Sequence, residues 1–131
     1  MKKNTKGFTL IELLAVIVIL AIIALIAVPV ILNILTKARE SAAEDTCYSV
    51  LNAAELYYAE SLLDNPTEAF VAKEFTFVEN GTVPAGLELK GTVPTGGVVT
   101  VSANGTATIT SALTIGELSC SQNGTAVNCT K

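Results

Sequence analysis

Residues 6–35 of the chain read KGFTLIELLAVIVILAIIALIAVPVILNIL, and this stretch decides how the rest must fold. Within it, residues 13–32 form a run of 20 residues without a charge. About 20 apolar residues make a helix long enough to cross a bilayer. The apolar region of a conventional signal peptide is shorter, about 7–15 residues. We therefore expect a helix that stays in membrane or packs among other apolar helices.

The charges are divided unevenly around this run. Three of the eight basic residues, Lys2, Lys3 and Lys6, precede it, and such a basic start keeps the N-terminus cytoplasmic while the rest is exported. Beyond residue 7, five basic side chains face twelve acidic ones, a side-chain balance of −7. An acidic surface repels phosphate backbones, so no direct nucleic-acid binding is expected.

Residues 6–12, Lys-Gly-Phe-Thr-Leu-Ile-Glu, resemble the prepilin peptidase site, or class III leader, of type IV pilins and pseudopilins. The resemblance implies cleavage after Gly7 and N-methylation of the new N-terminal residue, Phe8. It also implies an assembly role for Glu12, whose partner would be the amine of Phe8 on a neighbouring subunit. Pro29 falls where this family commonly carries a helix-bending proline. The resemblance covers about residues 1–50.

The residues support the same interpretation without the family. Gly7 lacks a Cβ, so a peptidase can bring its catalytic groups against the backbone. Glu12 places a costly carboxylate at the mouth of an apolar helix, and such residues are functional by default. The alternative for Glu12 is a place among the lipid headgroups of a plain membrane anchor. Pro29 predicts a bend or local melting, although transmembrane helices also tolerate proline.

The helical pattern continues beyond the apolar run, through residues 36–63. At 100° per residue one face collects apolar side chains and the other collects polar ones. The inward face is Cys47, Val50, Leu51, Ala54, Tyr58 and Leu62, and the outward face is Asp45, Ser49, Asn52 and Glu60, with Leu56 among them. Asp64-Asn65-Pro66 ends the helix, because the residue before proline avoids the α region. Such a helix would be about 80 Å long, too long for a headpiece of this size to bury.

Residues 64–131 have a composition that is typical of β-strands and turns. Asn65-Pro66-Thr67-Glu68 predicts the cap of a short helix through Lys73. Residues 99–102 and 106–110 flank Asn104-Gly105, which predicts a β-hairpin. The fold class is therefore α+β, a long N-terminal helix packed on a small antiparallel sheet. The expected segments are a leader (1–7), a transmembrane and filament-core helix (8–35), an amphipathic helix (36–63) and a β-rich headpiece (64–131).

The chain has three cysteines, Cys47, Cys120 and Cys129. In an exported domain this odd number indicates one disulfide and one cysteine that is left unpaired. If Asn123-Gly124 formed the two-residue turn, Cys120 would face Val127. If Gly124-Thr125 is the turn, Cys120 faces Cys129 as a non-hydrogen-bonded pair, where side chains stand closest. We predict that disulfide, which is similar to the C-terminal disulfide loops of many pilins, with Cys47 as a buried thiol. The alternative pairs Cys47 with either C-terminal cysteine. On the chain-entropy model that longer closure stabilises by about 4.6 kcal/mol, against about 2.7 kcal/mol for the hairpin.

No catalytic, cofactor or metal site is expected. The chain has no histidine, which excludes His-based catalysis, and no nucleophile–base set or phosphate loop stands out. Cys120 and Cys129 lack the clustered partners of a zinc site. The only acid after Glu88 is Glu117, so a C-terminal calcium cage is not expected.

The resemblance implies a structural, non-enzymatic subunit of a surface type IV pilus, serving adhesion, motility or biofilm formation. Its expected partners are like or related pilin subunits, the prepilin peptidase, the inner-membrane assembly machinery and, before assembly, membrane lipid. It would sit in the cytoplasmic membrane with its C-terminus outside, and then in an extracellular filament. The alternatives are a pseudopilin of a type II secretion or DNA-uptake system, or a single-pass protein whose headpiece binds a ligand.

Overall fold

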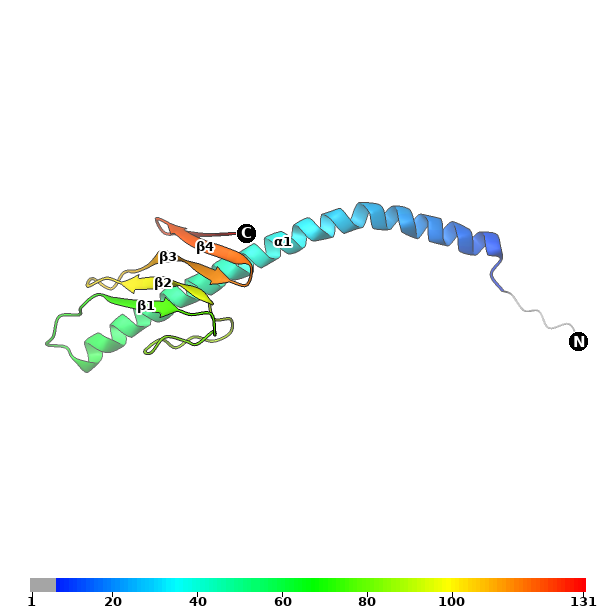
Figure 1. Ribbon diagram of the computed structural model, residues 1–131. Coiled ribbons are helices and arrows are strands. Elements are labelled where there is room, and N and C mark those ends of the chain that lie inside the picture. The colour runs from blue at the N-terminus through cyan, green and yellow to red at the C-terminus, as the bar shows by residue number, and fades with distance from the viewer. Residues whose placement is uncertain (1–6) are drawn as a thin grey trace, which may run out of the picture. The chain divides into compact units, whose positions relative to one another are not determined.

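The computed structural model describes residues 7–131 and has one long helix followed by five strands, an α+β arrangement (Figure 1). The elements are α1 (Leu10–Asp64), β1 (Lys73–Phe77), β2 (Gly96–Val101), β3 (Ala107–Ile115), β4 (Leu118–Asn123) and β5 (Ala126–Thr130). The chain divides into two compact units, Met1–Lys37 and Ala38–Lys131, and α1 contributes residues to both. The second unit, called the headpiece below, contains all five strands.

The end of α1 lies where the sequence predicts it. The helix ends at Asp64, and the N–H of Asn65 still donates to the carbonyl of Ser61, at 3.1 Å. Pro66 follows at once, and its ring together with its missing N–H prevents another helical turn. The predicted termination at Asp64-Asn65-Pro66 is therefore confirmed.

The predicted short helix over Pro66–Lys73 is wrong. Asn65 to Glu68 form one turn, with the N–H of Glu68 donating to the carbonyl of Asn65 at 3.2 Å, and β1 begins at Lys73. The ring of Phe70 packs edge-on against Tyr58, with centroids 4.8 Å apart. Packing of this aromatic residue and strand pairing of Lys73 with Val101 override the local capping signal.

The five strands form a single antiparallel meander in the order β1-β2-β3-β4-β5. The predicted hairpin around Asn104-Gly105 is the β2–β3 connection, in which Val101 pairs with Ala107. The N–H of Gly105 donates to the carbonyl of Ser102, and the N–H of Ser102 donates to that of Thr106. This is a type I-like turn followed by glycine, one of the common short hairpin loops.

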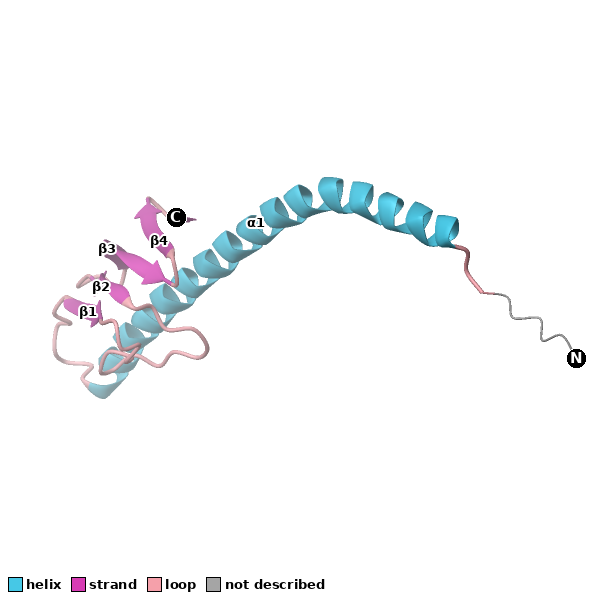
Figure 2. Cartoon of the chain, turned by 45° about the vertical axis from the view of Figure 1, so that its right-hand side comes forward, coloured by secondary structure: helices cyan, strands magenta, loops and turns pink. Residues whose placement is uncertain are grey.

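The core lies between one face of α1 and one face of the sheet, which Figure 2 shows as a layer of strands beside the helix. Strand residues alternate between buried and exposed, as in Phe75 and Phe77 of β1 and Val99 and Val101 of β2. The helix contributes Ala43, Cys47, Val50, Leu51 and Ala54. The predicted inward face is confirmed at four of its positions, from Cys47 to Ala54, and Tyr58 is half-buried.

The predicted burial of Leu62 is wrong. In the structure 38% of the surface of this residue is exposed. In this last part of α1, Phe70 packs on Tyr57 and Tyr58, and Leu62 lies outside the core cluster. The predicted outward residues Asp45, Ser49, Asn52, Leu56 and Glu60 are all exposed.

We expect matched leucine truncations to separate the core from the surface of the headpiece. Leu113 is fully buried, so Leu113→Ala should lower the free energy of unfolding by about 2–5 kcal/mol. Leu63 is 82% exposed, so Leu63→Ala should change it by less than about 0.5 kcal/mol. Urea unfolding of the full chain in detergent, followed by near-ultraviolet circular dichroism of the tyrosines, measures both. Equal losses in the two variants would contradict the assigned core.

Candidate functional site

The Gly7–Phe8 peptide bond lies in a non-helical segment before α1, and both residues are exposed. Gly7 does not have a positive φ, and a Cβ added there would meet no described atom within 4 Å. The described chain itself therefore does not require glycine at this position. The role predicted for Gly7, as the residue whose backbone a peptidase approaches, stays a prediction.

Thr9 and Glu12 form a reciprocal cap at the start of α1. The backbone N–H of Thr9 donates to Glu12 Oε2 at 3.1 Å, and the N–H of Glu12 donates to Thr9 Oγ1 at 3.3 Å. This is the capping box, in which an N-cap threonine and a glutamate three residues later satisfy each other's free N–H groups. Our sequence analysis missed it, although the pattern Thr-x-x-Glu before an apolar run was there to find. Glu12 thus has a local role in addition to the predicted role in assembly.

The first half of α1 presents apolar side chains on all sides. From Leu10 to Leu35 the large apolar residues are between 44% and 89% exposed. This helix is long and apolar enough to cross a membrane, and none of its most apolar window is buried within the described residues. A surface of this kind needs lipid or other apolar helices around it, because its exposure to water is strongly unfavourable. It therefore fits insertion into a membrane before any assembly.

Pro29 lies inside α1, and the helix continues without interruption on both sides of it. The predicted local melting is therefore not found. Proline has no N–H to donate to the carbonyl of Leu25, one turn earlier, so the helix lacks one backbone hydrogen bond at this point. A missing hydrogen bond of this kind is a common cause of a helix bend, so the predicted bend at Pro29 stays a prediction.

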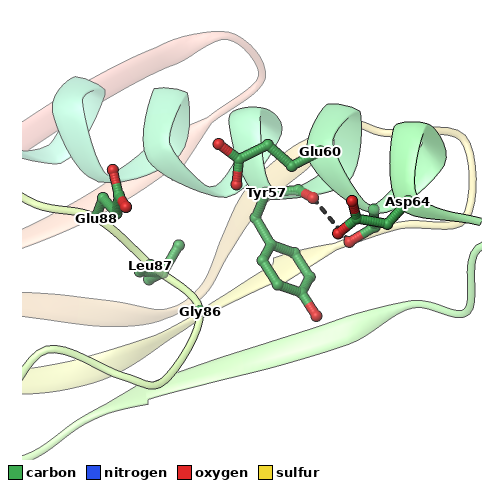
Figure 3. Close-up of a pocket in the computed structure, with 7 residues that line it drawn as sticks. Tyr57, Glu60, Asp64, Gly86, Leu87 and Glu88 are labelled. Atoms are coloured by element: carbon green, nitrogen blue, oxygen red, sulfur yellow. Dashed lines mark hydrogen bonds between the residues drawn. The ribbon is translucent and has the colours of Figure 1, made fainter.

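The headpiece has a surface hollow beside Tyr57, of about 370 Å³, between α1 and the loop at Gly86 (Figure 3). Glu60, Asp64 and Glu88 place carboxylates around it. The Ser61 hydroxyl donates to the carbonyl of Tyr57 at 2.8 Å, so it bonds to its own helix and is not paired with a general base. The arrangement of Ser61 is that of a helical residue rather than an activated nucleophile.

Tyr57 is held from several sides. Lys73 donates a hydrogen bond to its hydroxyl at 3.0 Å, and this contact lowers the pKa of Tyr57. The Lys73 ammonium also lies 4.6 Å from the ring centroid, and the ring packs edge-on against Phe75 at 5.2 Å. Gly86 has φ +95°, and a Cβ there would come within 2.8 Å of the tyrosine ring. Glycine is thus needed for this loop to pack against Tyr57.

The C-terminal hairpin has the register that the sequence predicts. Asn123 pairs with Ala126, and two steps further out Ser121 pairs with Asn128. Gly124 has a positive φ of 65° and Thr125 does not, as in a turn with glycine first.

Cys120 therefore faces Cys129, with Cα atoms 4.0 Å apart and sulfur atoms at disulfide-bonding distance. Cys47 lies beside this pair, buried on the inner face of α1. The three sulfur atoms lie within 4.8 Å of one another. The sequence analysis considered this proximity only as the alternative pairing, because Cys47 is more than 70 residues from the other two. Burial raises the pKa of the Cys47 thiol to about 11, and the nearby Glu44 carboxylate adds to the increase.

Comparison with known proteins identifies the N-terminal segment. Residues 2–28 match the family model described as the prokaryotic N-terminal methylation motif. The match covers about a fifth of the chain and marks a class III leader of type IV pilins and pseudopilins. This motif is typical of structural, pilin-type proteins. Searches of curated proteins and of solved structures find no significant match.

We predict that most purified chains carry the Cys120–Cys129 disulfide and a free Cys47. Trypsin cuts after Lys or Arg, so residues 91–131 contain both hairpin cysteines and residues 40–73 contain Cys47. Without reduction, the first peptide should be two hydrogens lighter than its sequence mass, and the second should accept one alkyl group after denaturation. A predominant cross-linked pair of these two peptides would contradict the hairpin assignment.

Proposed function

We propose that the chain is a structural subunit of a type IV pilus. A prepilin peptidase cleaves it after Gly7, the new N-terminal Phe8 is methylated, and α1 packs against other pilin helices in the filament. Before assembly the chain sits in the cytoplasmic membrane with the headpiece outside. Its partners are the peptidase, the inner-membrane assembly machinery and copies of this or related subunits.

One observation carries the proposal: a class III leader directly precedes a helix whose apolar side chains are exposed on every side. In a lone membrane anchor this helix would need only lipid. The leader adds a processing site that leaves Phe8 as a free N-terminus at the start of the same helix. A cut N-terminus followed by a bare apolar helix is the arrangement that a helix-packed filament requires.

The headpiece supports a passive role. Its core is filled by one face of α1 and by the sheet, and two residues that line its surface hollow, Tyr57 and Ser61, make structural hydrogen bonds. The proposed Cys120–Cys129 disulfide would add covalent stability to a domain that works outside the cell.

Surface filaments and secretion pseudopilins share the leader, so the experiment must separate them. Cells are sheared, and the released fraction is analysed by electron microscopy and mass spectrometry. Abundant filaments that contain this chain support the pilus subunit. Chains that remain in the membrane fraction, with loss of protein secretion or DNA uptake when the gene is deleted, identify a pseudopilin instead.

We expect cleavage between Gly7 and Phe8 with one methyl group on the new amine. The intact mass of the assembled chain should equal that of residues 8–131 plus one methyl group. Gly7→Val should block the cut, because its side chain obstructs the approach of the peptidase, and the uncut chain should accumulate in the membrane. Assembled material that retains residues 1–7 would falsify the assignment.

Two variants separate the assembly role of Glu12 from its capping role. Glu12→Gln keeps a capping-box acceptor but removes the charge. Loss of one partner from a buried ion pair costs about 3–5 kcal/mol, so filament yield should fall to a small fraction of wild type. Thr9→Ala removes the hydroxyl cap and keeps the charge. It should cost about 0.5–2 kcal/mol of local helix stability and leave filaments abundant.

Both variants should still be cut after Gly7, which intact mass checks independently of assembly. Filament yield is measured as the chain recovered in the sheared fraction relative to total cellular chain. If Glu12→Gln assembles like wild type while Thr9→Ala does not, the carboxylate serves the helix start and not a neighbouring subunit.

A further inference from the structure

Three sulfur atoms meet in the core of the headpiece. Cys47 comes from α1, Cys120 from β4 and Cys129 from β5, and all three side chains are at most 3% exposed. Each sulfur lies within 4.8 Å of the other two. A single disulfide in such a group leaves one thiol next to the bond, so three different pairings are within reach of small side-chain movements.

We propose that these cysteines form a three-sulfur exchange site, in which the Cys47 sulfur can displace one sulfur of the hairpin disulfide. The disulfide then moves from its place between β4 and β5 to a place between α1 and the hairpin. This proposal concerns the headpiece alone and does not depend on filament assembly.

The step balances without an outside oxidant or reductant. The Cys47 thiol first loses its proton to solvent. Its thiolate attacks Cys120 or Cys129, a new S–S bond forms, and the old S–S bond breaks. The displaced sulfur leaves as a thiolate and takes up a proton. One disulfide and one thiol are present before and after, so the reaction is an isomerisation.

The two pairings hold the fold differently. The hairpin bond joins cysteines nine residues apart on adjacent strands that are already hydrogen-bonded to each other. A bond from Cys47 closes a loop of about 70–80 residues that contains β1, β2 and β3. It would fasten the sheet to α1 and limit how far the two layers can separate. The exchange would therefore change the mechanical linkage of the headpiece while its overall packing is kept.

The surroundings of Cys47 keep this exchange slow at neutral pH. The thiolate is the attacking species, and burial among apolar groups raises the pKa of this thiol to about 11. Glu44, on the same helix, raises it further. A mildly alkaline solution is thus the condition in which interconversion can be followed while the headpiece is folded.

The test uses the mature full-length chain in detergent and follows where its one free thiol lies. One preparation is used as purified, and a second is reduced and then reoxidised at about pH 5, where exchange is stopped. Both are brought to about pH 9, and samples are acid-quenched, denatured and alkylated. The alkyl group is then located on residues 40–73 or residues 91–131 by peptide mapping.

We expect the two preparations to converge on one ratio of labelled peptides, at a rate that does not change when the protein is diluted. Two preparations that start at different ratios and keep them overturn the proposal, as does a rate proportional to protein concentration, which shows exchange between chains. Circular dichroism recorded at the same pH checks that the headpiece is folded throughout.

Two variants test the geometry separately. Cys129→Ser leaves Cys47 with Cys120, and Cys120→Ser leaves it with Cys129. Under native oxidation, at least one should give residues 40–73 cross-linked to residues 91–131 within a monomer. Cys47→Ser is the matched control and should give no such cross-link. If Cys129→Ser and Cys120→Ser are both folded and each retains two free thiols, Cys47 does not reach the hairpin sulfurs and the proposal fails.

Discussion

The packing of one helix face against one sheet face is the contact on which the headpiece depends. Five short strands in a meander have a single apolar face, and fewer than 70 residues follow α1. A sheet of this size cannot close a core by itself. Ala43, Val50 and Ala54 supply the missing layer, and the small alanines let the backbone of α1 come close to the strands. The hydroxyl of Tyr48 extends this contact to the edge strand, where it accepts a hydrogen bond from Val127 at 3.1 Å.

The same helix meets two different environments, and its composition changes accordingly. From Leu13 to Leu32 its side chains are apolar all round, while after Ala38 they divide into a buried and a polar face. A helix that is apolar all round is stable only within lipid or among other helices. The division into faces therefore marks where α1 begins to contribute side chains to the core of the headpiece. The sequence analysis places this change between residues 35 and 36, and the compact units of the structure divide between Lys37 and Ala38.

Local sequence patterns predicted most of the fold, because each of these patterns strongly favours one backbone conformation. The Asp64-Asn65-Pro66 stop and both glycine turns at the hairpins have strong backbone preferences. The errors concern segments whose structure is set by tertiary contacts. Phe70 packs on Tyr58, and its segment forms a turn in place of the predicted short helix. Leu62 is exposed and lies outside the core cluster of the headpiece. The proximity of Cys47 to the hairpin cysteines was only an alternative in the sequence analysis, because the spacing of residues along a helix shows which way a side chain points but not which strand lies opposite. The capping box could have been predicted and was overlooked.

The cap at Glu12 changes how its role in assembly should be understood. A carboxylate within an apolar helix implies a cationic partner when no other group bonds to it. The Glu12 carboxylate already has one bond, because its Oε2 accepts the N–H of Thr9. The charge itself still requires compensation, since among residues 7–131 the ion pair found is that between Lys131 and Glu117. Proposed cleavage would create an amine at Phe8, near a helix N-terminus that disfavours a positive charge. The amine and the carboxylate would then each need the other. Because Thr9 fixes the direction of Glu12, the cap would hold this carboxylate ready for the amine of a neighbouring chain.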